Sequence, residues 1–239
     1  MGQTAAIPEP ESIGTENLLT HGLTLVFSRA ARPESQRNSK SQQLAVKRAI
    51  DVFLGSFAII ALLPLIAAIA VAIKLDSRGP VLYASPRVGR KGLVFTCYKF
   101  RTMCRDADLF KPNLRLRNER AGAFFKLHDD PRVTRLGRWL RRYSLDELPQ
   151  LWNVLRGEMS LVGPRPHPLD DVARYEPGDF HRLDCTPGLT GLWQVTARRD
   201  PSFRRCVALD LDYIHRWNLL LDFQILARTL PAVVRGSGE

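Results

Sequence analysis

The residues with the clearest capacity for chemistry are two adjacent carboxylates, Asp146 and Glu147. Apolar residues recur at helical spacing behind them and Gly157 ends the pattern. We therefore expect a helix that starts between Ser144 and Glu147, with both carboxylates in its first turn. The helix dipole and the neighbouring Arg141 favour ionised carboxylates there. An ionised aspartate can attack phosphorus to give an acyl phosphate, and an adjacent glutamate can hold Mg²⁺ against phosphate oxygens.

A purely structural interpretation of the same residues stays open. Ser144 and Glu147 have the spacing of a capping box, in which each side chain bonds the backbone N–H near the other. Acidic residues in a first turn stabilise a helix by ~0.3–1 kcal/mol without any catalysis. The local pattern alone does not decide between capping and catalysis.

The proline-rich loop Gly163–Pro168 is a second candidate binding segment. Its three prolines restrict the backbone around Arg165, and a pre-oriented guanidinium suits bidentate contact with phosphate. A rigid connecting loop with an exposed arginine explains the same residues. The turn Pro187–Gln194 is more typical of a structural connection. No histidine has the spacing of a metal ligand, so we expect no histidine metal site.

The net charge of the 239-residue chain is +11, and the basic excess is concentrated in one region. Residues 85–142 carry sixteen basic and five acidic residues, an excess equal to that of the whole chain. This charge requires a polyanionic partner: nucleic acid, an anionic membrane surface or phosphate-bearing substrates. Residues 131–142 are predicted to form a basic amphipathic helix carrying Trp139, which is typical of a membrane interface. A solvated basic face on a core helix is the alternative.

The segment from Val52 to Ile73 contains 22 residues without a charge. As a helix it would be about 33 Å long, close to the ~30 Å hydrocarbon core of a bilayer. A buried helix of a soluble protein seldom runs so far without a polar face. Basic residues lie near both ends, which the positive-inside rule keeps on the cytoplasmic side, and Pro64 kinks the middle. We therefore expect a re-entrant hairpin kinked at Pro64 in preference to a straight span.

Composition and pattern divide the chain into three parts. Residues 1–43 are mixed and polar, without a secretory signal, and we interpret them as a mobile arm. Residues 44–76 form the kinked re-entrant membrane helix, and residues 77–239 a cytosolic catalytic domain. This domain is expected to be mainly α with a few short strands, an α+β fold, with a strand over 94–100 and helix and loop over 104–120. An apolar content of 45% argues against a largely disordered chain and a multi-span transporter. The four cysteines have no metal-ligand spacing, which favours free thiols in a reducing compartment.

Five motifs together resemble those of the bacterial sugar transferases, the monotopic polyprenyl-phosphate phosphoglycosyl transferases. They follow in that family's order over roughly residues 44–235: Lys47-Arg48 with Asp51, YKFRTM (98–103), SLDELPQL (144–151), GPRP (163–166) and PGLTG (187–191). The sequence departs from the family in three places. Leu63 precedes Pro64 where a serine is found in the best-described branch, Thr186 replaces a basic residue, and Ala197 replaces a glycine.

The resemblance implies transfer of a sugar-1-phosphate from a UDP-sugar to undecaprenyl phosphate, on the cytoplasmic face of the bacterial inner membrane. In this interpretation Asp146 takes the phosphosugar and releases UMP, Glu147 helps to bind Mg²⁺ beside it, and membrane lipids surround the kinked helix. The form of the C-terminal motifs is most similar to members that serve exopolysaccharide assembly, often as galactose or glucose phosphate transferases. Positions that match the family's donor-binding residues are Lys99 or Arg101, Arg141, Arg165 with Pro166, and Asp210.

A rival hypothesis is a membrane-tethered basic nucleic-acid-binding protein whose residues 85–142 contact the phosphate backbone. The sequence contains no helix-turn-helix, zinc or single-strand stacking motif, so we expect no nucleic acid partner. The intact Asp146–Glu147 pair argues against an inactive relative kept as a scaffold. The sequence leaves open the transferred sugar, the glycan pathway and whether the chain forms a homo-oligomer.

Overall fold

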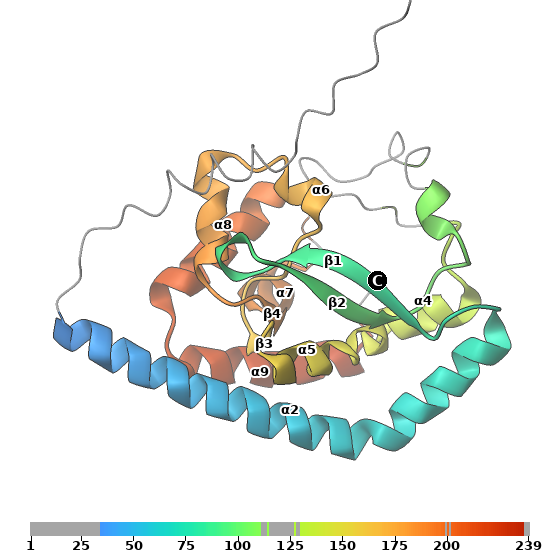
Figure 1. Cartoon of the computed structure of the whole chain (residues 1–239), viewed down its shortest axis with the longest axis horizontal. Helices are drawn as coiled ribbons and strands as arrows, with labels where there is room; N and C mark the ends of the chain where they lie inside the picture. Colours follow the sequence, from blue (N-terminus) through green and yellow to red (C-terminus); the bar gives the residue numbers. More distant parts are fainter. Residues whose placement is uncertain are drawn as a thin grey trace, which may run out of the picture.

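The long helix α2 (Glu34–Asp76) opens the computed structural model, which describes residues 34–110, 130–198 and 202–236 together with residues 114, 127 and 200. Pro64 lies inside the helix, and Figure 1 shows α2 bent near its middle. A bend is expected where a proline removes a backbone hydrogen bond. Residues 34–43, which were expected to belong to a mobile arm, are helical and form the start of α2; residues 1–33 of that arm lie outside the described part of the chain.

Short strands and helices follow α2 in an α+β arrangement (Figure 1). Strands β1 (Leu82–Val88) and β2 (Val94–Phe100) form an antiparallel hairpin, and β3 (Ser160–Val162) pairs in parallel with β4 (Gly188–Thr190). The helical elements are η1 (Arg90–Gly92), η2 (Ala107–Phe110), α4 (Arg135–Arg142), η4 (Leu145–Glu147), α5 (Gln150–Arg156), α6 (Leu169–Val172), η5 (Pro177–Asp184), α7 (Leu192–Thr196), α8 (Phe203–Arg216) and α9 (Leu219–Val234). The expected strand over 94–100 and the α+β class are confirmed.

The helix expected over residues 131–142 begins later, at Arg135. Thr134 is its N-cap and accepts a hydrogen bond from the backbone N–H of Gly137 at 2.9 Å. Val133, just before the cap, pairs instead with Met103 in an isolated β-bridge. A threonine with a free side-chain oxygen is a strong helix start, and this capping signal was missed in the sequence.

The apolar surface of α2 is largely uncovered. Within the described residues, Lys40–Asp76 is the one helix long and apolar enough to cross a membrane, and its most apolar 18-residue window has a mean hydropathy of 2.7. Only 11% of its most apolar window is buried. Phe53 and Ile60 are more than two-thirds exposed, at 71% and 72%. An apolar surface of this extent is unfavourable in water and suits the interior of a bilayer.

Charged side chains attach the N-terminal half of α2 to the rest of the protein. Lys47 donates to Asp222 in α9 at 2.6 Å, and Arg48 donates to two backbone carbonyls at the C-terminal end of α5. Asp51 accepts a hydrogen bond from the backbone N–H of Leu161 in β3 at 3.0 Å. These hydrogen bonds give the polar side chains of α2 partners where the helix packs against the rest of the protein. The Lys47, Arg48 and Asp51 motif therefore anchors α2 to the rest of the protein and lies outside the site described below.

The C-terminal half of α2 packs on the same domain. A buried cluster joins it to β2 and α4, and its members are Ile69, Ile73, Phe100 and Leu140. A second cluster lies behind the N-terminal half, and its members include Val154, Met159, Tyr213 and Ile225. Both halves of one apolar helix are therefore held by a single domain.

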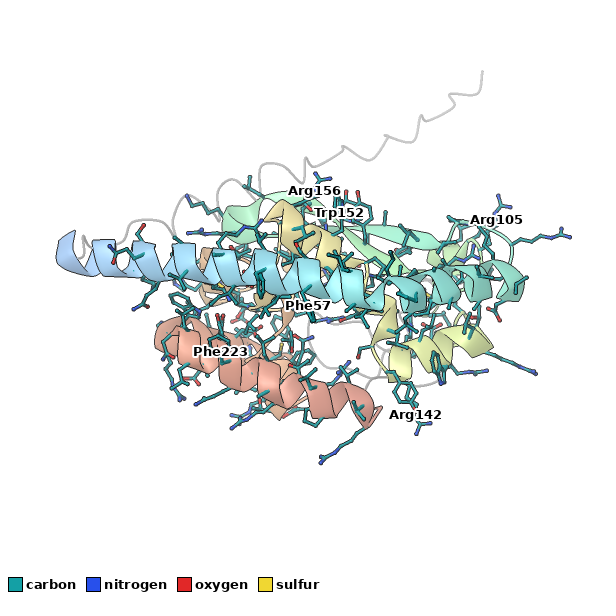
Figure 2. All side chains as sticks on the ribbon, turned by 90° about the horizontal axis from the view of Figure 1, so that it is seen from below. Phe57, Arg105, Arg142, Trp152, Arg156 and Phe223 are labelled. Carbon is teal, nitrogen blue, oxygen red and sulfur yellow. The ribbon has the colours of Figure 1, made fainter. Side chains whose placement is uncertain are left out.

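Helices α2, α5 and α9 present a common apolar face. Figure 2 views this face and shows Phe57, Trp152 and Phe223 rising from these three helices. The three side chains are 64%, 54% and 50% exposed. Arg142 on α4 lies at the edge of the same view, and Trp139 on the same helix is half-exposed. Exposed aromatic side chains bordered by arginine are typical of a membrane interface.

Candidate active site

A cavity of about 760 Å³ lies between the β1–β2 hairpin, η2, α4, η4 and α7. Its size is within the range of small-molecule sites. Asp146 and Glu147 line it, so the carboxylate pair opens onto a space that can hold a ligand. Much of the basic excess of residues 85–142 also lines it, in the side chains of Arg87, Lys99, Arg101, Arg105, Arg132 and Arg141. The cavity is therefore suited to an anionic ligand.

The carboxylate pair lies in a 3-10 turn and not in the first turn of an α-helix. Ser144 adopts a left-handed conformation (φ 55°), the turn η4 covers Leu145–Glu147, and α5 starts only after Pro149. Ser144 makes no capping hydrogen bond; its Oγ accepts one from Arg198 at 2.9 Å. The expected helix start and the capping-box interpretation are both wrong. Neither carboxylate is used to cap a helix.

Glu147 is held by two cations. Its Oε1 accepts from Lys99 at 2.7 Å and from Arg165 at 2.5 Å, and its Oε2 accepts from Arg165 at 3.2 Å. Burial acts to raise the pKa of Glu147, but Arg165 and Lys99 outweigh it and hold the pKa well below its usual value. Glu147 is therefore an ionised group that fixes both cations in the cavity.

Asp146 is also buried, but its contacts with cations are weaker than those of Glu147. Its carboxylate lies 3.9 Å from Lys99, the nearest cation among the described residues, and 7% of the residue is exposed. Burial raises the pKa of Asp146, and Lys99 opposes this effect. A carboxylate with open oxygen atoms beside a ligand-sized cavity can act as a nucleophile or as a metal ligand.

Three of the residues expected to bind the donor line the cavity, and two of them contact the carboxylate pair. Lys99 and Arg165 contact Glu147, and Arg141 lines the same cavity while its Nε donates to Thr102 at 2.9 Å. Arg101 also lines the cavity, but its Nη atoms donate to the carbonyls of residues 77 and 78, where α2 ends. Of the two alternatives Lys99 and Arg101, only Lys99 touches the pair.

Asp210 and Pro166 do not line the cavity. Asp210 is 2% exposed and forms an ion pair with Arg182 at 2.5 Å. Arg182 in turn donates to the backbone carbonyl of Arg165 at 3.1 Å. Asp210 therefore lies outside the cavity and is connected to it through Arg182 and the loop that carries Arg165.

Several lining residues were missed in the sequence as candidates. Arg87 was counted only within the basic region 85–142, and Arg198 was not named as a candidate. Trp193 and Gln194 were assigned to a structural turn, although both line the cavity. The residue types of Trp193 and Gln194 were a usable signal, because aromatic and amide side chains are frequent in ligand sites. This signal was missed because both residues lie far from the carboxylate pair along the chain.

The carboxylate pair fits a magnesium ion shared with a bound phosphate. In the described part of the chain, no group of three or more His, Cys, Asp or Glu side chains could hold a metal by itself. Mg²⁺ is usually held by one or two carboxylates together with substrate phosphates. Asp146 has open oxygens, and Oε2 of Glu147 has a single contact at 3.2 Å within these residues.

Comparison with known proteins shows the family of the chain. Residues 42–236 match the family described as bacterial sugar transferase. The chain is 44% identical over 198 residues to the exopolysaccharide production protein ExoY of Sinorhizobium fredii, covering 81% of this chain and 87% of ExoY. It is 41% identical over 207 residues to the galactosyl transferase CpsE of Streptococcus agalactiae, covering 85% of this chain and 45% of CpsE. It is also 45% identical over 199 residues to the undecaprenyl-phosphate glucose phosphotransferase of Komagataeibacter xylinus, covering 77% and 35%. The chain thus spans less than half the length of the latter two relatives.

Proposed function

The chain belongs to the bacterial sugar transferase family, and on this basis we propose that it transfers a sugar-1-phosphate from a UDP-sugar to undecaprenyl phosphate. Relatives named as undecaprenyl-phosphate galactose and glucose phosphotransferases support both the reaction and the lipid acceptor. ExoY supports a place in exopolysaccharide production. The observation that carries the proposal is Asp146, an open carboxylate in a basic cavity next to a carboxylate already neutralised by Lys99 and Arg165.

The reaction proceeds in two displacements. A carboxylate oxygen of Asp146 attacks the phosphorus that carries the sugar, the bond from that phosphorus to the UMP oxygen breaks, and UMP leaves with the electron pair. The phosphosugar is then an acyl phosphate on Asp146. An oxygen of undecaprenyl phosphate attacks the same phosphorus, the bond to Asp146 breaks, and the lipid diphosphate sugar leaves with the carboxylate restored.

The cations of the cavity bind and orient the phosphates. Lys99 and Arg165 are fixed by Glu147 and present the remaining N–H groups to phosphate oxygens. Arg141 is oriented by Thr102 on another side of the cavity. A Mg²⁺ ion held by Asp146 and Glu147 would neutralise phosphate charge when bound. Asp146 is only 7% exposed, which limits the access of bulk water to an acyl phosphate formed there.

We place the protein on the cytoplasmic face of the bacterial inner membrane, with α2 as a re-entrant helix. The anchor of Lys47 on Asp222 and the packing of Ile73 on the same domain support this topology. A helix that crossed the bilayer would carry its two ends to opposite sides, and one domain could not hold both. Pro64 supplies the bend that returns the helix to the face it entered.

The experiment that tests this function measures UMP release from a panel of UDP-sugars by the purified protein in lipid nanodiscs, with and without undecaprenyl phosphate. We expect one or a few UDP-sugars to release UMP, and the sugar phosphate to appear on the lipid. Absence of release from every UDP-sugar would contradict the proposal. Tight binding to duplex or single-stranded DNA at physiological salt in a gel shift would favour the nucleic-acid hypothesis instead.

A further inference from the structure

Arg87 in β1 is a cavity residue that forms no ion pair with a carboxylate in the described part of the chain. Within the described residues, no acidic side chain lies within 4 Å of its guanidinium nitrogens, although it lines the cavity with Asp146 and Glu147. Its Nε is fully buried and makes no hydrogen bond there. Its Nη1 donates one long hydrogen bond, 3.3 Å, to the carbonyl of Pro166.

Three other cations that line the cavity are paired with carboxylates. Lys99 and Arg165 share Glu147, and Arg132 pairs with Asp130 at 2.6 Å. A partly buried guanidinium without such a partner is unfavourable, because its solvation is lost and nothing replaces it. Burial lowers the pKa of Arg87 from its ordinary value and outweighs the opposing effects of Cys97 and Asp171, while the positive charge of Arg165 lowers this pKa further. The free protein therefore holds an unfavourable cation at this position.

The backbone of Arg87 is held on both sides. It pairs with Phe95 across the β1–β2 hairpin and with Pro168 in an isolated β-bridge. The neighbouring Val88 N–H donates to the carbonyl of His167 at 3.0 Å. The side chain therefore starts from a rigid point between the hairpin and the loop of Arg165, and binding an anion there would not require ordering of the backbone.

We propose that Arg87 is a phosphate-binding residue that, together with Arg165, holds a phosphate group of a substrate in the cavity. A phosphate oxygen supplies the missing negative charge and accepts from the unpaired N–H groups of Arg87. The assignment of this phosphate group to a particular substrate rests on the proposed function. It is either part of the diphosphate of the sugar donor or the phosphate of the lipid acceptor, and the two sources share this chemistry.

A purely structural role would consist of bracing Pro166, and so Arg165, through the long hydrogen bond. The two roles differ when Arg165 is removed. If Arg87 acts only by placing Arg165, then Arg87→Gln changes nothing further in an Arg165→Gln background. If Arg87 contacts the phosphate, the loss persists in that background.

The test is calorimetric titration of the full-length protein in nanodiscs with inorganic pyrophosphate. Arg87→Gln is expected to weaken binding about 10- to 100-fold, in the wild-type and in the Arg165→Gln background alike. Arg87→Lys, which keeps the charge, should lose less. Arg90→Gln, on the exposed tip of the same hairpin and outside the cavity, is the matched control and should bind like the wild type. Unchanged binding in Arg87→Gln, or no further loss in the Arg165→Gln background, would overturn the proposal.

Two half-reactions identify the source of the phosphate. Slower UMP release from the UDP-sugar without lipid assigns Arg87 to the donor, and slower discharge of a preformed intermediate to undecaprenyl phosphate assigns it to the acceptor. Wild-type rates in both steps would count against the proposal. The pyrophosphate titration needs no turnover, so it judges Arg87 even if the protein releases no UMP and the proposed function fails.

Discussion

Arg165 donates a hydrogen bond to Glu147 from each of its two terminal nitrogens, at 2.5 and 3.2 Å. The same arginine offers its backbone carbonyl to Arg182, which is itself paired with the buried Asp210. Side chain and main chain of one residue are therefore fixed independently. In a phosphate site, such double fixation means that little reorganisation is needed when charge develops in the reaction.

Loss of the charge on Glu147 should disable the site. Glu147→Gln keeps the size of the side chain but removes the anion that holds Lys99 and Arg165. Hydrogen bonds to charged groups contribute about 1.5–3 kcal/mol, so we expect the rate of UMP release to fall about 10- to 100-fold. Single-turnover UMP release measures this effect. A rate within twofold of the wild type would show that the ion pairs have no part in the reaction.

Asp210 should affect the site through the stability of its buried ion pair. Asp210→Asn leaves Arg182 buried without its partner, which costs about 3–5 kcal/mol of unfolding free energy. We also expect a fall in kcat with a smaller change in KM, because Arg165 loses its brace while the cavity lining stays. Denaturant unfolding and steady-state kinetics measure the two effects.

The matched control for Asp210 is Asp212→Asn on the same helix. Asp212 is 39% exposed and pairs with Arg216 on the surface, and exposed pairs contribute about 0–1 kcal/mol. The Asp212→Asn substitution should leave both the unfolding free energy and kcat near the wild-type values. Equal effects of the two substitutions would remove the argument for the Arg182 connection.

The pH dependence of UMP release should report Asp146. The attacking form is the carboxylate, and burial raises its pKa. The rate should therefore fall as the pH is lowered through a pKa above that of an exposed aspartate. Glu147, whose pKa is held well below its usual value, does not titrate in this range. Lys99→Met removes the main opposing charge and should move the acidic limb to higher pH. A shift to lower pH would reverse the assigned sign.

The topology of α2 can be read by labelling. Single cysteines at Ser41 and Arg78, in a background with the exposed Cys104 replaced, flank the apolar segment. In intact cells a membrane-impermeant reagent should label neither, and after the cytoplasmic face is exposed it should label both. Labelling of the Ser41 position in intact cells would establish a spanning helix. Pro64→Leu, which removes the kink, is expected to increase such labelling.

The sequence predicted those features that short-range pattern controls. The uncharged run that ends at Ile73, the kink at Pro64 and the strand over 94–100 all follow from local periodicity and residue type. The helix behind the carboxylate pair was predicted to start too early. Pro149 was accepted as an early helical residue, whereas a left-handed Ser144 makes a separate 3-10 turn before it.

The site itself was only partly predictable, because its members come from distant segments. Asp146, Glu147 and Arg165 belong to short motifs of unusual composition and were found. Arg87 is distinguished from the other basic residues by its place in the cavity lining, which the sequence does not show. The ion pair between Asp210 and Arg182 is likewise visible only in the structure. Partners that lie far apart along the chain cannot be assigned from spacing alone.

The central claim is that Asp146 carries the phosphosugar, and detection of the adduct tests it most directly. The protein is mixed with a reactive UDP-sugar without lipid, quenched, and analysed by intact mass and peptide mapping. We predict one phosphosugar per chain on the peptide containing Asp146, with one equivalent of UMP released. Undecaprenyl phosphate should discharge the adduct, and Asp146→Asn should form none. UMP release that requires the lipid, or an adduct that persists in Asp146→Asn, would contradict the account.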